Sequence, residues 1–155
     1  MRQQALSWRW CVFLGVSAIL AASGCNYGPK MAEVRGQVFY KDGTVPVGGV
    51  SVIRFEPADD STAEVRQGAS GSINSDGSFE MSSKVFGDGV YYGDYVVTFS
   101  VMRSPTDPTP FIQPKYMTRS ASPYKVTIDG DVADLKYEIE PLPGVKGAAP
   151  APPAG

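Results

Sequence analysis

Residues 95–101 of the chain read YVVTFSV, an unbroken run in which large apolar side chains occupy every second position. One face of this segment carries Tyr95, Val97, Phe99 and Val101, and the other face carries Val96, Thr98 and Ser100. A repeat of two residues is typical of a β-strand that buries one of its faces. The segment therefore predicts a strand whose larger side chains enter a core.

The same alternation recurs in both directions from this segment. It is clear over residues 34–40, 124–128 and 135–140, and further strands are expected at 49–56, 66–73 and 77–82. The segments are separated by Asp-Gly pairs, at 42–43, 76–77, 88–89 and 129–130, which supply the left-handed conformation that tight turns need. About seven short strands without a helix between them predict an all-β fold, an antiparallel β-sandwich.

Gly93-Asp94-Tyr95 lies just where the first segment begins. It is similar to a tyrosine corner, in which the hydroxyl of a tyrosine at the start of a strand bonds to backbone a few residues upstream. A plain core tyrosine explains the same residues equally well.

The N-terminus has the three parts of a secretory signal. Arg2 and Arg9 are not balanced by any acidic residue, the apolar run 11–22 follows, and the small pair Ser23-Gly24 comes before Cys25. The apolar run is too short for a membrane-spanning helix, which needs roughly 20 residues. Residues 1–24 are therefore expected to be a signal peptide that is removed.

Residues 22–25, Ala-Ser-Gly-Cys, resemble the lipobox that ends in the lipidated cysteine of bacterial lipoproteins. Ala22 departs from the leucine that is usual at this position. Because Cys11 lies in the signal, Cys25 would be the single cysteine of the mature chain, unable to form an internal disulfide. Lipidation at Cys25 is the prediction, and an ordinary signal peptide that leaves a free thiol is the alternative.

The resemblance implies a cell-envelope protein anchored to a membrane through its N-terminal lipid, periplasmic or surface-exposed. Asn26 stands where aspartate is the usual signal for inner-membrane retention, which favours the outer membrane. Loss of Arg2 and Arg9 lowers the formal charge from −2 to −4. A mildly acidic chain lacks the basic surface that nucleic acid requires, so no nucleic-acid partner is expected.

The mature chain is expected to have three parts. Residues 25–32 are short and polar and predict a tether, residues 33–142 predict one domain, and residues 143–155 are rich in Pro, Ala and Gly. This last segment has too few bulky apolar side chains to offset the entropy of ordering it, which predicts a disordered tail.

Three motifs resemble those of carboxypeptidase regulatory-like domains. Residues 34–38 (VRGQV) with 46–50 (PVGGV) are similar to the opening of that family, 74–79 (NSDGSF) to its hairpin, and 93–97 (GDYVV) to its Gly-x-Tyr strand. The resemblance covers about residues 34–140, and the segment before the strand 124–128 resembles a lipoprotein subgroup of the family. It implies an Ig-like, transthyretin-like sandwich of seven strands, and it implies no catalytic residues.

The composition removes most catalytic chemistry. The chain has no histidine, and after lipidation it would have no thiol, which excludes zinc sites, Ser-His-Asp triads and Cys-His pairs. Ser82-Ser83-Lys84 is a conceivable Ser–Lys arrangement, but a solvated strand end explains it better because adjacent strand residues face opposite sides. A protein that is not an enzyme and has no cofactor is expected.

Carboxylates leave one weak metal candidate. Asp129, Asp131 and Asp134 place three oxygen-bearing side chains within a short segment, loosely like a calcium loop. The segment lacks the remainder of an EF-hand pattern, and a turn between strands is rich in Asp and Gly for conformational reasons alone. The turn is the favoured interpretation, with no metal bound.

Aromatic residues offer a possible ligand-binding surface. The candidates are Tyr91, Tyr92, Phe111 and Tyr116. The last two lie in the segment 103–123, which is longer than ordinary connections and is therefore either functional or pinned to the sandwich. Exposed rings there would bind a glycan or a peptide, whereas buried rings would close the end of the core, and burial is favoured. The leading hypothesis is a non-catalytic module with a structural or protein-interaction role, and the alternative is a glycan- or peptide-binding module that uses this segment.

Overall fold

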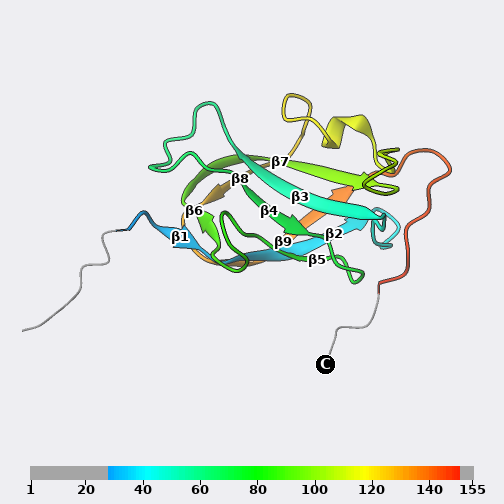
Figure 1. Cartoon of the computed structure of the whole chain (residues 1–155), viewed down its shortest axis with the longest axis horizontal. Helices are drawn as coiled ribbons and strands as arrows, with labels where there is room; N and C mark the ends of the chain where they lie inside the picture. Colours follow the sequence, from blue (N-terminus) through cyan, green and yellow to red (C-terminus); the bar gives the residue numbers. More distant parts are fainter. Residues whose placement is uncertain (1–27, 151–155) are drawn as a thin grey trace, which may run out of the picture.

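The computed structural model describes residues 28–150 and shows an all-β sandwich (Figure 1). The predicted signal peptide, residues 1–24, and the predicted lipidation site Cys25 lie outside the described residues. The strands are β1 (Met31–Ala32), β2 (Val34–Tyr40), β3 (Val50–Pro57), β4 (Ala69–Ser72), β5 (Ser78–Glu80), β6 (Val90–Tyr91), β7 (Gly93–Met102), β8 (Lys125–Ile128) and β9 (Val132–Ile139). One sheet has the order β5-β2-β9, the other β4-β3-β7-β8, and β1 pairs with β6. Within residues 28–150 the helical element is the 3₁₀ turn η1 (Pro114–Tyr116), and no helix there is long and apolar enough to cross a membrane.

The predicted alternation places side chains correctly in most strands. In β2 every second residue from Val34 to Tyr40 is buried, and Arg35, Gln37 and Phe39 between them are more exposed. The central strand β7 differs, because Val96, Thr98 and Ser100 on its outer face are buried as well. Side chains of β3 cover that face: Glu56 accepts a hydrogen bond from Thr98 at 3.0 Å, and Arg54 donates one to Ser100 at 2.7 Å.

The sandwich is not wholly antiparallel. Strand β2 pairs antiparallel with β5 on one side, but it pairs parallel with β9 on the other. The register of this parallel pair shifts between Val34 and Gly36. Gly36 has no room for a side chain, since a Cβ there would lie 2.3 Å from the Leu135 carbonyl oxygen. The prediction of antiparallel pairing is therefore wrong for β2 and β9. Their pairing brings the last strand of the domain beside its first long strand.

All seven predicted strands are present, and two short ones are added. The additions, β1 and β6, pair through Met31 with Tyr91 and Ala32 with Val90. Ala32 is 2% exposed, so the folded part begins before residue 33. The tether predicted for residues 25–32 is correspondingly shorter.

The C-terminal segment contacts the sandwich. Val45 and Ala148 exchange two backbone hydrogen bonds of 2.8 and 3.1 Å, although they come from opposite ends of the domain. Gly147 packs so closely on Tyr40 and Thr44 that a Cβ would lie 2.2 Å from the Thr44 hydroxyl oxygen. The prediction of disorder from residue 143 onward is wrong up to residue 148, because backbone pairing replaces the side-chain burial that the segment lacks.

Candidate functional site

A tyrosine corner joins β6 to β7. The Tyr95 hydroxyl donates a hydrogen bond of 2.7 Å to the Tyr91 carbonyl oxygen, and Tyr95 is 1% exposed. The prediction of a corner is confirmed. Burial raises the pKa of the Tyr95 hydroxyl, with a smaller contribution from Tyr91, so it stays protonated and serves as a donor.

The two tyrosines beside this corner differ in exposure. Tyr91 is 5% exposed, whereas Tyr92 is half-buried and lines an open groove of about 480 Å³. Lysine side chains lie over both rings, with Lys84 Nζ 5.4 Å from the Tyr91 centroid and Lys30 Nζ 5.9 Å from the Tyr92 centroid. Both tyrosines line this groove, and Tyr92 is the more exposed of the two.

The segment 103–123 is pinned to the sandwich along its length. Phe111 donates its backbone N–H to the Val101 carbonyl at 2.8 Å, and Ile112 forms a bridge with Pro141. Ile112 is fully buried, and the ring of Phe111 packs against the core. The length of this segment therefore reflects the path it covers over the sandwich.

Tyr116 closes the end of the core. It is 4% exposed, lies edge-on to Phe99 with the ring centroids 6.4 Å apart, and stacks on Tyr124 at 6.0 Å. Lys115 Nζ covers the outer side of this ring at 4.9 Å and pairs with Glu140 at 2.9 Å. A ring that is enclosed in this way offers no face to a ligand, which is the outcome favoured from the sequence.

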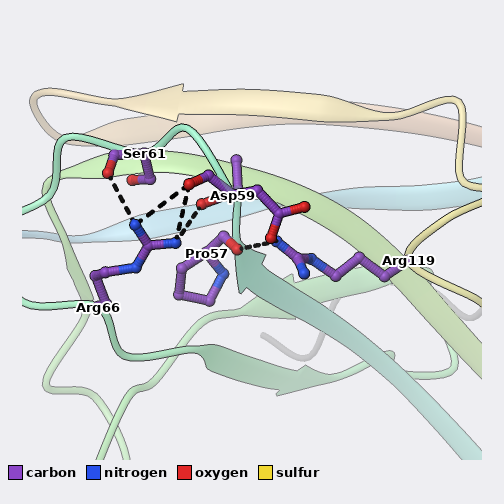
Figure 2. A network of polar contacts seen from close by, with 6 residues as sticks. Pro57, Asp59, Ser61, Arg66 and Arg119 are labelled. Atoms are coloured by element: carbon purple, nitrogen blue, oxygen red, sulfur yellow. Dashed lines mark hydrogen bonds and ion pairs between the residues drawn. The ribbon is translucent and has the colours of Figure 1, made fainter.

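Two arginines organise the surface next to this segment (Figure 2). Arg66 donates to the backbone carbonyls of Ala58 at 2.8 Å and Ser61 at 3.2 Å, which holds the loop after β3 in a tight curve. Arg119 reaches across from segment 103–123 and donates at 2.7 Å both to the Pro57 carbonyl and to a carboxylate oxygen of Asp59. The loop after β3 and segment 103–123 are thus both held at the C-terminal end of β3.

An open groove of about 720 Å³ lies beside these arginines. Its charged lining comes from Asp59 and Asp60 on one loop, Arg119 on the other, and Lys125 at the start of β8. The mixed charge suits a polar ligand better than an apolar one. No sequence pattern marks this groove, because its residues belong to three separate segments that only the fold brings together.

The aspartates of the weak calcium candidate do not converge. Asp131 accepts the backbone N–H of Glu33 at 2.8 Å, and within residues 28–150 no three His, Cys, Asp or Glu side chains are grouped so that they could hold a metal ion. Asp129 directly follows β8, whereas Asp134 lies within β9. Residues 129–131 form the turn between β8 and β9, as the favoured interpretation of the sequence has it.

The hydroxyls of Ser82 and Ser83 are used within their own loop. Ser82 Oγ accepts the Gly87 N–H at 2.9 Å, and Ser83 Oγ donates to the Gly89 carbonyl at 2.9 Å. Lys84 points to the Tyr91 ring instead of either serine. These contacts support a structural role for the three residues.

Across the described part of the chain, the candidate residues thus lie in the core, in strands and turns, and along the groove of about 480 Å³. No protein-family model, curated protein or solved structure matches the chain.

Proposed function

We propose that this chain is a lipid-anchored, non-catalytic module of the bacterial cell envelope with a structural or protein-interaction role. The observation that carries the proposal is the Ala22-Ser23-Gly24-Cys25 lipobox at the end of a secretory signal. Asn26 favours the outer membrane as the site of anchoring. The lipid on Cys25 is the connection to the membrane.

The start of the fold agrees with this arrangement. Strand β1 begins at Met31, six residues after Cys25. A fully extended chain of that length spans at most about 20 Å. The sandwich would therefore be held close to the membrane, with the end that carries β1 and β6 facing it.

We further propose that the domain is carboxypeptidase regulatory-like. Residues of the family's motifs have specific structural roles, which supports this assignment. Gly36 allows the close β2–β9 contact, and Tyr95 forms the tyrosine corner. Asp76 accepts the backbone N–H of Ser78 at 2.9 Å in the hairpin motif. A non-catalytic role agrees with serine hydroxyls that are used inside their own loop.

Replacement of Cys25 tests the anchoring directly. Cys25→Ser leaves the signal and the fold intact but removes the lipidation site, so the variant is expected to move from the washed membrane fraction to the soluble envelope fraction. Cys11→Ser is the matched control, because that cysteine lies in the signal and its variant should stay with the membrane. Equal membrane retention of both variants, with residues 1–24 removed from both, would argue against the anchor.

A glycan- or peptide-binding module is the second candidate. The observation in its favour is the polar groove beside Arg119, which the end of segment 103–123 helps to form. Lys125→Ala should weaken binding of a glycan or peptide in an array or pull-down. Lys136→Ala, at an exposed position of β9 outside this groove, should not. Equal binding by both variants would remove this groove as the site. Tyr116→Ala is unsuitable for this test, because it would open the core.

A further inference from the structure

The loop that joins β5 to β6 presents the most exposed large apolar side chains among the described residues. We call residues 82–89 the apical loop. Within it Phe86 is 89% exposed and Val85 is 67% exposed. Burying either side chain against another apolar surface would be favourable, because it would remove apolar area from water, so the pair is placed to contact an apolar partner.

The apical loop holds this pair in a fixed conformation. The Asp88 carboxylate accepts the backbone N–H groups of Ser83 at 2.7 Å, Lys84 at 2.8 Å and Val85 at 3.0 Å. Gly87 and Gly89 have φ angles of 81° and 84°, which reverse the chain on the far side of the tip. The exposure of Phe86 is therefore a property of an ordered loop.

This loop stands at the end of the molecule where the folded chain begins (Figure 1). Gly89 lies directly against β1, since a Cβ on it would be 2.3 Å from the Ala32 carbonyl oxygen. Lys84 covers the ring of Tyr91, and Tyr91 pairs with Met31 in β1. The apolar tip and the segment that leads back to Cys25 thus share one end of the sandwich.

We propose that the Val85–Phe86 tip inserts into the interface of the lipid bilayer and acts as a second membrane contact. The inference rests on the proposed anchoring at Cys25, which would keep the tip within reach of the bilayer. Insertion is then an intramolecular step, so the modest apolar area of two side chains is enough to hold the tip in the bilayer interface. The tip orients the sandwich relative to the membrane.

The charges around the tip agree with a lipid surface. Lys84 and Lys30 lie at this end, and their long side chains can extend toward phosphate groups while the stems stay near apolar atoms. The Asp88 carboxylate is turned inward onto three N–H donors. Aromatic rings such as Phe86 at an interface are a usual feature of peripheral membrane binding.

The mature chain, residues 25–155, allows a clean test. Both tryptophans lie in the signal, and Cys25 is the one cysteine that remains. The protein can therefore be coupled through Cys25 to a maleimide lipid in vesicles of phosphatidylcholine and phosphatidylglycerol. Phe86→Trp then places a single tryptophan at the tip, and Val47→Trp places one at another exposed position, 44% exposed in the wild type, in the β2–β3 loop.

On coupling, the emission of Phe86→Trp should move to shorter wavelength and be quenched by brominated lipid, and that of Val47→Trp should stay unchanged. Unchanged emission from Phe86→Trp in vesicles that carry the coupled protein would overturn the proposal, and so would equal shifts in both variants. Chemical coupling replaces natural lipidation, so this result does not depend on whether Cys25 is lipidated in the cell. Failure of the tip and failure of the anchor are therefore distinguishable.

Discussion

Tyr95 and Tyr91 are joined by a buried hydrogen bond of 2.7 Å, from the side-chain hydroxyl of the first to the backbone carbonyl of the second. The bond links the start of the long strand β7 to the short strand β6, which itself pairs with β1. It therefore connects the core to the end of the sandwich that we place near the membrane. The ring of Tyr95 also packs on Phe55, with the centroids 5.9 Å apart.

Removal of this hydroxyl should destabilise the fold. Tyr95→Phe keeps the ring but deprives the buried Tyr91 carbonyl of its donor, and an unsatisfied buried polar group costs roughly 1–3 kcal/mol. Tyr137→Phe is the matched control, because the buried Tyr137 hydroxyl has no hydrogen-bond partner among the described residues. Urea unfolding should show a loss for the first variant and no loss, or a gain, for the second. Equal stability of both would contradict a specific role of the corner.

Arg119 should stabilise the protein through the Pro57 carbonyl more than through its ion pair. Asp59 is 92% exposed, and exposed ion pairs contribute little. Arg119→Ala is expected to cost about 1–2 kcal/mol and to make segment 103–123 more sensitive to protease, since it removes a charged donor from a partly buried carbonyl. Asp59→Asn should change the unfolding free energy by less than about 0.5 kcal/mol. If Asp59→Asn is as costly as Arg119→Ala, the ion pair is the main contribution.

Gly36 should tolerate no side chain. A Cβ at this position would meet the Leu135 carbonyl oxygen at 2.3 Å and the Phe79 ring at 2.7 Å, so Gly36→Ala must separate β2 from its neighbours. The expected cost is about 1–3 kcal/mol in chemical unfolding. Gly130→Ala, in the β8–β9 turn, meets nothing within 4 Å and should cost less than about 0.5 kcal/mol. Similar values for the two variants would mean that the β2–β9 contact is looser than described.

The apical loop should loosen in acid. Burial raises the pKa of the Asp88 carboxyl, but the N–H groups of Val85, Ser83 and Lys84 outweigh it and hold this pKa below the ordinary 3.8. The carboxylate therefore stabilises the loop fully above the pKa of an unfolded aspartate, and this contribution is lost as the pH falls through the lower folded-state pKa. In an NMR titration, the amide shifts of Lys84 and Val85 should change with a midpoint below 3.8.

At neutral pH, Asp88→Asn should have a similar local effect. The amide can accept through only one oxygen, whereas Ser83 donates to one carboxylate oxygen of Asp88 and Lys84 and Val85 donate to the other. Exchange of the amide hydrogens on one of these two sides should therefore become about tenfold faster, equivalent to about 1.4 kcal/mol of local opening. The core amide of Val97 should exchange as before. Faster exchange throughout the sandwich would show instead that Asp88 supports the whole fold.

The sequence predicts those parts of the fold that depend on local patterns. Alternation identifies β2, β7, β8 and β9, and the inward side chains of these strands are mostly the expected ones. Segment 103–123 is longer than ordinary connections, which leaves two roles for Tyr116 in the sequence analysis, ligand binding and closure of the core. Its burial between Phe99 and Lys115 follows from the folded structure.

The features that the sequence does not reveal depend on contacts between distant residues. The parallel pairing of β2 with β9 and the bridge between Val45 and Ala148 join opposite ends of the domain, and neither leaves a periodic signal. Arg119 binds the Pro57 carbonyl, a group that every residue possesses, so no side-chain type in the sequence marks the contact. The exposed Phe86 is likewise apolar in sequence, and only the loop geometry distinguishes it from a core residue.

Mass spectrometry of the mature N-terminal peptide tests lipidation of Cys25 most directly. Trypsin treatment of the membrane fraction should release a peptide that begins at Cys25, ends at Lys30 and carries the added mass of a lipid. The same peptide from the Cys11→Ser variant should be identical. An unmodified peptide, or a mature chain that begins at another residue, would contradict the anchor and the membrane orientation that follows from it.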